Sequence, residues 1–475
     1  MWSETWAMLH YIAALAVSVR VLLRPRLEPT VRLSWILVIE LVPLVGIIAY
    51  ILFGEIRMRG AETQRMADIR HRLSGDWRPS PWTVHDAPFF AEGVIASNTA
   101  IDDLNAVSGN SIELLPESYA AIDDLVAAID GAQDHVHLLF YIWLDDMSGR
   151  KVAEACMRAV GRGVVVRVII DAVGSYHFSR TDTYTKLKAA GVQAVEALPL
   201  GLPIIGALFQ RMDLRNHRKI MVIDSALGFT GSRNCSDKAF AVKPRFAPWI
   251  DVFLRVRGPV VRQMQAIFLQ DWMSYTEEDL GWMLDIIDGV VSPGETAQVV
   301  ATGPDRRFGS LSGSMTAMLY AARRKVTITT PYYVPDAALD SAIRAAARRG
   351  VDVTMILPRR NDSLIVQATS EGYYYGLVQA GVKLHLFNGG LLHAKIICVD
   401  DEMAMVGSAN MDRRSFELNY EMNLLVVGAE TPRELDERQE SYIARSDQIT
   451  LEDIRDWSVW RRLRNNTLAL AAPLL

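Results

Sequence analysis

The sequence predicts an α/β protein in which two related α/β sandwich lobes follow an apolar N-terminal hairpin. Three observations lead to this prediction. Two long apolar stretches open the chain, and the same strand–helix–strand pattern then occurs twice, at 135–175 and 326–362. Each copy closes on a motif of the same spelling, as expected of an internal duplication. Because strands and helices alternate, each half should form a sheet covered by helices.

The two apolar stretches are residues 5–23 and 33–53. Each is long enough to cross about 30 Å of hydrocarbon as a helix. A cleaved signal peptide is the alternative for the first stretch, but its flank MWSE contains no Lys or Arg, and a second apolar stretch follows closely. We therefore expect a retained transmembrane hairpin over 1–56, although the second stretch alone is also compatible with a buried core helix.

Charged residues in and beside the hairpin give weaker predictions. Arginines follow both apolar stretches and are more numerous after the second, which favours a cytoplasmic body and a multi-pass protein of the cell membrane. Arg20 and Glu40 would lie within about one helical turn of each other in depth, so we expect them to pair. An intramembrane carboxylate with a functional role is the alternative for Glu40.

The composition limits the possible functions. The chain has 475 residues, 50 basic and 55 acidic, with a net charge of −5, and half of its residues are apolar. This balance excludes a nucleic-acid binder that works by bulk positive charge, and it is wrong for a disordered chain. The three widely spaced cysteines argue against a disulfide framework or a zinc cluster.

The body divides into three predicted parts. The polar stretch 57–105 is expected to be a linker, and the two copies are expected to form lobes over 106–288 and 289–475. They join near the turn-rich sequence DGVVSPGE. In each copy, β-branched runs flank a segment with helical spacing, and a second helix ending in AAGV or QAGV precedes the closing motif.

The closing motifs carry the predicted chemistry. HRKIMVID is followed six residues later by GSRN, and HAKIICVD is followed at the same offset by GSAN. One H-x-K-x4-D motif occurs easily by accident, whereas two copies with matched downstream motifs in a duplicated fold do not. The predicted catalytic residues are His217, Lys219, Asp224, His393, Lys395 and Asp400.

The spacing of these residues suits a phosphodiester. A His and a Lys two apart on a strand project from one face, whereas the Asp has the opposite parity and is interpreted as an orienting or structural group. Gly and Ser of GSxN let the backbone approach an anion. The predicted phosphate-binding residues are Ser232, Asn234, Ser408 and Asn410. One His would attack phosphorus and the other would protonate the leaving oxygen, with no metal or other cofactor expected.

These motifs resemble the duplicated HxK…D…GSxN pattern of the phospholipase D superfamily, from Gly109 onward. The hairpin and the stretches TTPYYVPD, LLHAKIICVDDEMAMVGSANMDRRSFELNYE and WRRL resemble its bacterial cardiolipin synthase branch. The resemblance implies two lobes with pseudo-twofold symmetry, one active site between them and a covalent phosphohistidine. It also implies an acidic partner for each histidine. By sequence order, Glu421 matches His393 and Asp251 matches His217.

The resemblance further implies a reaction between two lipids. His217 would take a phosphatidyl group from one phosphatidylglycerol, and His393, as acid and then base, would deliver a second phosphatidylglycerol to form cardiolipin, although the sequence does not order the two histidines. The membrane and these lipids are the expected partners, with no nucleic acid, and a homo-oligomer stays open. The alternatives are a phospholipase D-type hydrolase, a synthase using phosphatidylethanolamine, a membrane-tethered nuclease and a non-catalytic scaffold.

Two further segments are candidates for lipid contact. The apolar insertion 198–209 has no counterpart in the second copy, and is either a lipid-facing lip or a buried loop. The tail from Ile454 carries Trp457, Trp460 and Leu463 among arginines. This pattern favours a helix in the headgroup layer over an ordinary packed helix with a solvated basic face.

Overall fold

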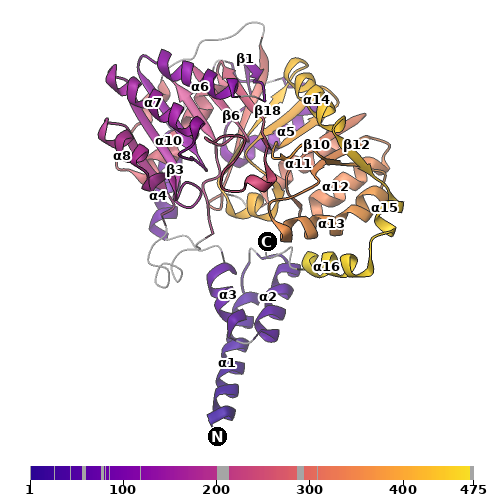
Figure 1. Cartoon of the computed structure of the whole chain (residues 1–475). Coiled ribbons are helices and arrows are strands. Elements are labelled where there is room, and N and C mark those ends of the chain that lie inside the picture. The colour runs from indigo at the N-terminus through magenta and orange to yellow at the C-terminus, as the bar shows by residue number, and fades with distance from the viewer. Residues whose placement is uncertain are drawn as a thin grey trace.

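The protein is a broad α/β body carried on a narrow helical stalk, as the computed structural model shows (Figure 1). The structure describes residues 2–25, 27–42, 44–55, 60–75, 80, 82–84, 86–117, 119–199, 213–285, 294–306 and 309–470. The N-terminus lies at the far end of the stalk, and the chain enters the body at the other end. Apart from its first two residues, the insertion predicted at 198–209 lies outside the described residues.

The stalk consists of α1 (Trp2–Leu22), α2 (Pro29–Leu41) and α3 (Val45–Phe53), with α1 packed against α2 and α2 against α3. Among the described residues, α1 is the one helix long and apolar enough to cross a membrane. The second apolar stretch does not form the single helix that we expected. Pro43 stands between its two segments in the sequence, and a proline in a helix interior removes a hydrogen bond and clashes with the preceding turn.

The predicted Arg20–Glu40 ion pair is wrong. Arg20 Nε instead lies 2.6 Å from Glu55 Oε1, and Arg24 Nη2 lies 2.5 Å from Glu55 Oε2. Glu40 accepts a hydrogen bond of 3.1 Å from Ser18 Oγ. Arg20 is in the last turn of α1, so it lies level with the residue just beyond α3, and Glu40, near the end of α2, lies level with an earlier turn of α1.

The described strands of the two halves form one continuous 15-stranded sheet, in the order β19-β13-β12-β10-β15-β16-β18-β9-β1-β8-β6-β5-β2-β3-β4. Outward from the antiparallel β1–β9 pair at the centre, equivalent strands of the two halves follow in the same order on each side, and β19 is an extra strand at one edge. The first-half strands are β1 (Val107–Leu114), β2 (His135–Phe140), β3 (Val165–Asp171), β4 (Gln193–Ala197), β5 (Ile220–Ile223), β6 (Leu227–Gly231) and β8 (Phe253–Arg257). The second-half strands are β9 (Glu295–Thr302), β10 (Lys325–Thr329), β12 (Asp352–Pro358), β13 (Lys383–Phe387), β15 (Ile396–Val399), β16 (Met403–Gly407), β18 (Glu421–Val427) and β19 (Ser446–Ile449).

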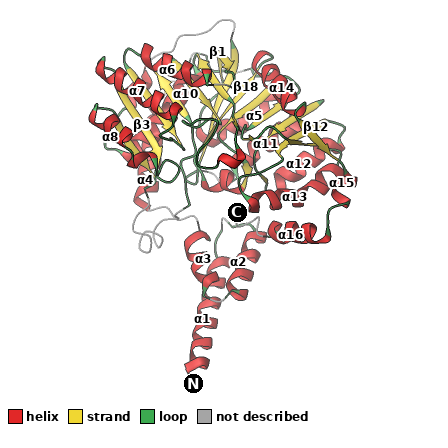
Figure 2. Ribbon diagram, viewed as in Figure 1, coloured by secondary structure: helices red, strands yellow, loops and turns green. Residues whose placement is uncertain are grey.

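Helices cover both faces of the sheet (Figure 2). One face carries α10 (Val260–Tyr275) and α14 (Glu430–Ile443), whose apolar residues share a single core across both halves. The other face carries separate cores under the remaining helices, namely α6 (Ala120–Gly131), α7 (Met147–Gly161) and α8 (Asp182–Ala189) in the first half, and α11 (Ser310–Ala321), α12 (Ala337–Arg348) and α13 (Leu364–Gln379) in the second. Burial on both faces explains the nearly continuous apolar strands.

The duplication extends to the chemistry of the helix ends. The N-caps of α7 and α12 are Asp146 and Asp336, whose carboxylates accept hydrogen bonds from the backbone nitrogens of Gly149 (3.0 Å) and Leu339 (2.8 Å). Gly163 and Gly350 follow the two helices at φ of 91° and 89°. A residue in this left-handed region turns the chain from each helix into the next strand, and glycine adopts it without strain.

The polar stretch 57–105, predicted to be a linker, contains two helices that pack on the body. α4 (Gly60–Gly75) lies against α10, and α5 (Phe89–Asp102) lies against α11 and β9. Ala91 and Val94 of α5 are buried in the core of the second half. The polar composition of 57–105 therefore gave no indication that α5 has an apolar face that packs on the body.

The C-terminal tail forms α15 (Leu451–Arg455) and α16 (Val459–Ala469), and α16 packs on α13. Glu371 of α13 binds Arg461 (3.0 Å) and Asn465 (2.7 Å) of α16. The opposite face of α16 is apolar and open, because Trp460 is 79% exposed. The contacts with α13 support the predicted alternative of a packed helix, and a position in the headgroup layer stays a prediction.

Candidate active site

The two predicted histidines lie where the halves meet, each held by backbone of the opposite half. His217 and Lys219 directly precede β5, and His393 and Lys395 directly precede β15. The backbone nitrogen of His217 donates a 2.9 Å hydrogen bond to the carbonyl of Tyr420. That of His393 donates a 2.8 Å bond to Ile250, next to the pairing of β14 (Leu391–Leu392) with β7 (Trp249–Ile250).

Both imidazoles line a single cavity of about 270 Å³. Tyr141 meets the ring of His217 edge-on at a centroid distance of 4.7 Å, and Trp249 lies 4.7 Å from the ring of His393. The cavity is also lined by polar side chains from both halves, including Arg215, Asn234, Lys243, Tyr332, Asp362, Asn410, Asp412 and Arg414. The structure thus brings the two HxK motifs, 176 residues apart in sequence, to one polar cavity.

The carboxylate partners of the histidines are crossed between the halves. His217 Nδ1 donates to Glu421, at 3.0 Å from both carboxylate oxygens, and His393 Nδ1 donates to Asp251 Oδ1 at 2.6 Å. The pairing by sequence order, with Asp251 behind His217 and Glu421 behind His393, is therefore wrong. Each acid begins, or directly precedes, a strand near the central β1–β9 pair, so it faces the histidine of the other half.

The serines of the GSxN motifs hold these acids. Ser232 Oγ donates to Asp251 Oδ1 at 2.7 Å and accepts from the backbone nitrogen of Val252 at 3.0 Å. Ser408 Oγ donates to Glu421 Oε2 at 2.5 Å and accepts from the nitrogen of Met422 at 2.9 Å. Their predicted role as phosphate ligands is not supported, because both hydroxyls are committed to the acids.

The glycines of the same motifs allow a close approach between strands. A Cβ on Gly231 would lie 2.3 Å from the carbonyl oxygen of Val252, and one on Gly407 would lie 2.4 Å from that of Met422. The backbone therefore approaches the strand that follows each acid, not an anion as predicted.

The asparagines of GSxN do line the cavity. Asn234 Oδ1 accepts a 3.2 Å hydrogen bond from the backbone nitrogen of Ile142, which leaves its amide N–H groups for a ligand. Asn410 is its counterpart from the second half and is 5% exposed. The predicted phosphate set thus divides into cavity-lining asparagines and acid-holding serines.

The two lysines are buried, and each is held by the backbone of the histidine two residues before it. Lys219 Nζ donates to the carbonyl of His217, and Lys395 Nζ donates to that of His393, each at 2.6 Å. Burial lowers the pKa of Lys219 to about 8 and the pKa of Lys395 to about 7, although nearby Glu421 and Asp251 oppose the shift. Both groups titrate closer to neutrality than an ordinary lysine.

Burial also fixes the protonation of the histidines. It lowers the pKa of His217 to about 4, against the opposing effect of Glu421, and it lowers the pKa of His393 as well. Burial alone would raise the pKa of Glu421, but the facing His217 and Lys219 bring it down to about 2. A neutral imidazole that donates Nδ1–H to a carboxylate keeps a lone pair on Nε2.

The two aspartates of the HxKx4D motifs directly follow β5 and β15, at the other end of each strand from the histidine and the lysine. Asp224 accepts backbone hydrogen bonds from residues 133–135 at 2.8–2.9 Å, and Asp400 accepts them from residues 323–325 at 2.7–2.8 Å. Each fixes the start of the neighbouring strand, β2 or β10. These contacts support the structural interpretation of their parity and give no support to counting the two aspartates as catalytic.

Several cavity residues were not among the sequence candidates. Tyr141 lies one residue beyond β2 and Tyr332 lies three residues beyond β10, so each copy places a tyrosine shortly after its first long strand, although not at the same position. Trp249 lies two residues before Asp251 and stacks on Phe240 at 3.9 Å. Arg414 begins a short helical turn (Arg414–Leu418) and lines the cavity, and nothing in the motif spacing indicated it.

Comparisons with known proteins agree with this geometry. The family described as "Cardiolipin synthase, PLD-like domain" matches residues 125–272 and 315–443, and "Phospholipase_D-nuclease N-terminal" matches 12–55. Cardiolipin synthase A of Proteus mirabilis (strain HI4320) is 34% identical over 474 residues, covering 98% of this chain and 97% of that protein. Cardiolipin synthase A of Klebsiella pneumoniae (strain 342) is 35% identical over 477 residues, with the same coverage.

Among solved structures, phosphatidylserine synthase of Haemophilus influenzae Rd KW20 aligns with a TM-score of 0.58. The alignment covers 82% of this chain and 100% of that one at 13% identity, so it supports the fold alone. Fold and site together define a phosphatidyltransferase of the phospholipase D superfamily. Within it, the chain belongs to the cardiolipin synthase family, which confirms the resemblance seen in the sequence.

Proposed function

We propose that this enzyme makes cardiolipin by moving a phosphatidyl group from one phosphatidylglycerol to the terminal hydroxyl of another. The observation that carries the proposal is the pair of imidazoles at one cavity, each oriented through Nδ1 by a carboxylate from the opposite half. One histidine is then free to act as nucleophile and the other as acid and base. The identity of the lipid substrates is inferred from membership of the cardiolipin synthase family.

In the first step, His217 Nε2 attacks the phosphorus of the donor lipid. An N–P bond forms as the P–O bond to glycerol breaks, and His393 gives its proton to the departing glycerol oxygen. A bound phosphodiester anion favours the protonated form of His393, opposing the effect of burial on its pKa. The asparagine amides and the two buried lysines stabilise the charge that develops on phosphorus oxygens.

In the second step, the neutral His393 removes the proton from a hydroxyl of the second phosphatidylglycerol. That oxygen attacks phosphorus, the N–P bond to His217 breaks, and cardiolipin leaves with His393 protonated again. Water is the competing acceptor, and positioning of the lipid hydroxyl favours transfer over hydrolysis.

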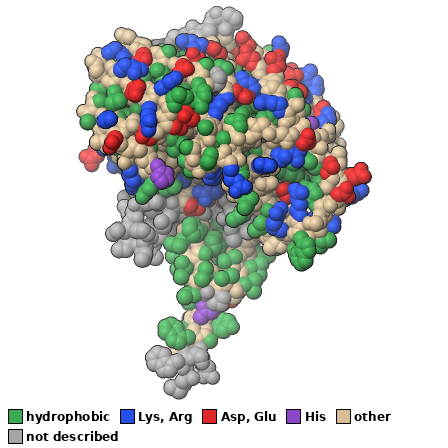
Figure 3. Space-filling model, in the orientation of Figure 1, with side chains coloured by type: hydrophobic (Ala, Val, Ile, Leu, Met, Phe, Trp, Pro, Cys, Tyr) green, Lys and Arg blue, Asp and Glu red, His purple; other side chains and the backbone are tan. Residues whose placement is uncertain are grey.

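The position of the cavity supports a membrane-bound substrate. The turn between α1 and α2 reaches the body, where Glu28 pairs with Arg413 at 2.5 Å, between the cavity-lining Asp412 and Arg414. The body-side end of the stalk therefore lies beside the cavity. Figure 3 shows a largely apolar stalk surface with basic side chains on the body close to it. We infer that α1 anchors the enzyme in the bilayer, where both lipids reside.

The exposed apolar face of α16 supports the same orientation. Val459, Trp460 and Leu463 are each more than half exposed, and α16 lies on the stalk side of the body (Figure 1). We infer that this helix rests in the headgroup layer. Replacing Trp460 and Leu463 with serine should lower activity in proteoliposomes more than in detergent micelles, and equal losses in both would contradict this.

We also propose that the enzyme lies in a bacterial inner membrane and that its body is on the cytoplasmic side. Protease added to inverted membrane vesicles should cleave the body, whereas protease added to intact spheroplasts should not. The opposite pattern would place the body outside.

The function is tested by incubating the purified, solubilised enzyme with phosphatidylglycerol labelled in both headgroup and acyl chains. Cardiolipin and free glycerol in equal amounts are expected. Phosphatidic acid as the main product would identify a hydrolase. Cardiolipin formed only after phosphatidylethanolamine is added would identify a synthase that uses phosphatidylethanolamine as one of its two substrates.

A further inference from the structure

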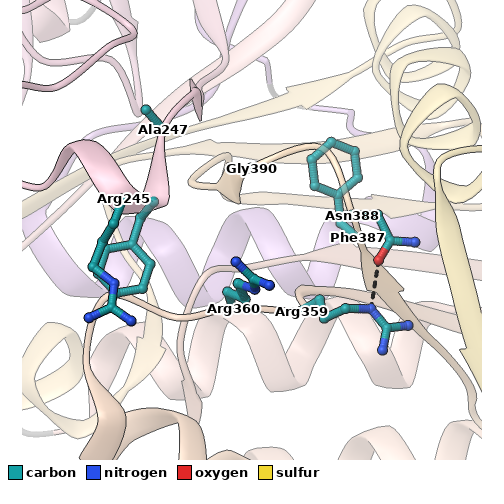
Figure 4. Close-up of a pocket in the computed structure, with 8 residues that line it drawn as sticks. Arg245, Ala247, Arg359, Arg360, Phe387, Asn388 and Gly390 are labelled. Atoms are coloured by element: carbon teal, nitrogen blue, oxygen red, sulfur yellow. Dashed lines mark hydrogen bonds between the residues drawn. The ribbon is translucent and has the colours of Figure 1, made fainter.

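A second cavity, of about 320 Å³, is rich in arginine (Figure 4). Its walls come from both halves of the chain, principally from Arg245, Phe246, Arg359, Arg360, Asn388 and Gly390. Figure 4 shows Arg360 between Arg245 on one side and Arg359 on the other. None of these residues lines the catalytic cavity or has a role in the proposed two steps.

The two cavities are neighbours along three separate segments of chain. Arg245 lies two residues beyond Lys243, and Arg360 lies two residues before Asp362, with Lys243 and Asp362 both lining the catalytic cavity. Gly390 lies three residues before His393. Lys243 Nζ and Asp362 Oδ2 form an ion pair of 2.6 Å. The two segments that this pair joins therefore contribute residues to both cavities.

The arginine cavity carries uncompensated positive charge. Arg359 donates to Asn388 Oδ1 at 2.6 Å and also pairs with Asp447. Arg245 and Arg360 are exposed, and no ion pair joins either of them to a carboxylate within the described part of the chain. Among the described residues, the guanidinium groups of Arg245 and Arg360 therefore have no carboxylate partner at this cavity. A guanidinium presents a planar set of donors that matches the oxygens of a phosphate.

The proposed reaction creates a need for such a site. Two anionic lipids must be held together, and only one of their phosphates reacts at the histidines. The other phosphate keeps its negative charge throughout and ends one glycerol away from the reacting phosphorus in the product. A binding site for it must lie next to the catalytic cavity, on the side where the acceptor enters.

We propose that the arginine cavity binds the phosphodiester of the acceptor lipid, with Arg245 and Arg360 as its principal ligands. This assignment rests on the proposed function. Binding the acceptor phosphate there would place its glycerol hydroxyl toward His393 and would select an anionic lipid over water or free glycerol as acceptor. The cavity is thus a specificity site for the second half of the reaction.

The test compares two reactions of the same purified full-length enzyme. Cardiolipin synthesis uses the acceptor phosphate, whereas exchange of labelled free glycerol into phosphatidylglycerol uses only the donor lipid and both histidines. The change is Arg245→Gln or Arg360→Gln. Each should lower the ratio of cardiolipin synthesis to glycerol exchange by about tenfold, through a weaker apparent affinity for the acceptor, because each removes a charge-assisted contact to phosphate.

The matched control is Arg257→Gln, an exposed arginine at the end of β8 far along the strand from Asp251. It should leave the ratio unaltered, and Arg245→Lys should restore part of it. An unaltered ratio in both cavity variants would overturn the proposal. So would variants that mainly change inhibition of glycerol exchange by inorganic phosphate, since that result assigns the cavity to free phosphate. If the wild type exchanges glycerol but makes no cardiolipin, the proposed function fails and the cavity has no acceptor lipid to bind.

Discussion

At the scale of single residues, the proposed chemistry depends on the crossed hydrogen bonds between histidines and acids. Glu421 is fully buried and is shared by His217 and Ser408, and Asp251 is shared in the same way by His393 and Ser232. Each carboxylate fixes the tautomer of an imidazole, so that Nε2 faces the cavity. Neither half of the chain contains a complete histidine–acid pair, which makes each half dependent on the other for catalysis.

The first prediction tests which acid serves which histidine. Glu421→Gln should alter the ¹⁵N resonances of His217 and leave those of His393 in place, because only His217 loses its carboxylate. Asp251→Asn should do the reverse. Each substitution should also lower turnover by about 10²–10⁴-fold, as loss of an orienting carboxylate does in other histidine-based sites. Histidine-labelled NMR, with resonances assigned from His217→Asn and His393→Asn, makes the measurement, and the opposite pattern would restore the pairing by sequence order.

The second prediction concerns pH. His217 is a nucleophile only when neutral, so kcat/KM should rise as pH increases through about 4, the lowered pKa of this residue. His393 must be protonated to release glycerol, and burial lowers its pKa, so kcat/KM should fall once the pH exceeds the pKa of His393 and should fall further beyond about 7, where Lys395 loses its positive charge. A profile measured on mixed micelles from about one pH unit below the pKa of His217 up to pH 9 should be bell-shaped. Activity that still climbs between pH 7 and 9 would show that the charge on Lys395 is not needed.

At the scale of elements, the site depends on strands that approach unusually closely. Gly231, at φ 140°, ends β6 against the residue that precedes β8, and Gly407 ends β16 against β18. These contacts let the following serine reach the acid on the neighbouring strand. The glycine of GSxN therefore allows the close approach of the backbone, and the serine makes the hydrogen bond to the acid.

The third prediction is that Gly231→Ala destabilises the fold and disables the site together. The new methyl group would meet the Val252 carbonyl at 2.3 Å in a backbone conformation that alanine rarely adopts. We expect a loss of about 1–3 kcal/mol in unfolding free energy, the usual cost of overpacking. Gly131→Ala, at the end of α6 with open space around its Cβ, should be neutral or slightly stabilising. Denaturant unfolding of the solubilised protein compares the two, and equal stability would contradict the argument.

At the scale of the whole molecule, the two lobes are one structure. The central β1–β9 pair joins them into a single sheet, and the core on the α10 and α14 face runs through both halves. A lobe by itself would expose a strand edge and one side of this core to water. The duplication visible in the sequence therefore does not mean two independent folding units.

The fourth prediction is that the halves function only together. Residues 1–288 and 289–475, expressed separately, should each fail to form phosphohistidine, because His217 then lacks Glu421 and His393 lacks Asp251. Co-expression of the two pieces should restore measurable cardiolipin synthesis. Labelling of His217 in the first piece alone would show that the crossed pairing is dispensable.

The sequence by itself determined the features that depend on local chemistry and repetition. Alternating apolar runs and helical spacing predicted the α/β class, and the matched HxK and GSxN motifs identified the cavity histidines and asparagines. Parity along the strand favoured an orienting or structural role for Asp224 and Asp400, although the matched motifs led us to count both among the catalytic residues. All of these features follow from residues close together in the chain or from a pattern repeated along it.

Only the tertiary structure decided which groups meet across the pseudo-twofold axis. The exchange of Glu421 and Asp251 between the histidines, and the partnership of Arg20 with Glu55, join residues whose neighbourhood depends on how whole elements dock. The arginine cavity likewise combines segments more than a hundred residues apart, and no motif links them. Sequence order carries no information about such contacts, because facing surfaces are fixed by packing and not by spacing along the chain.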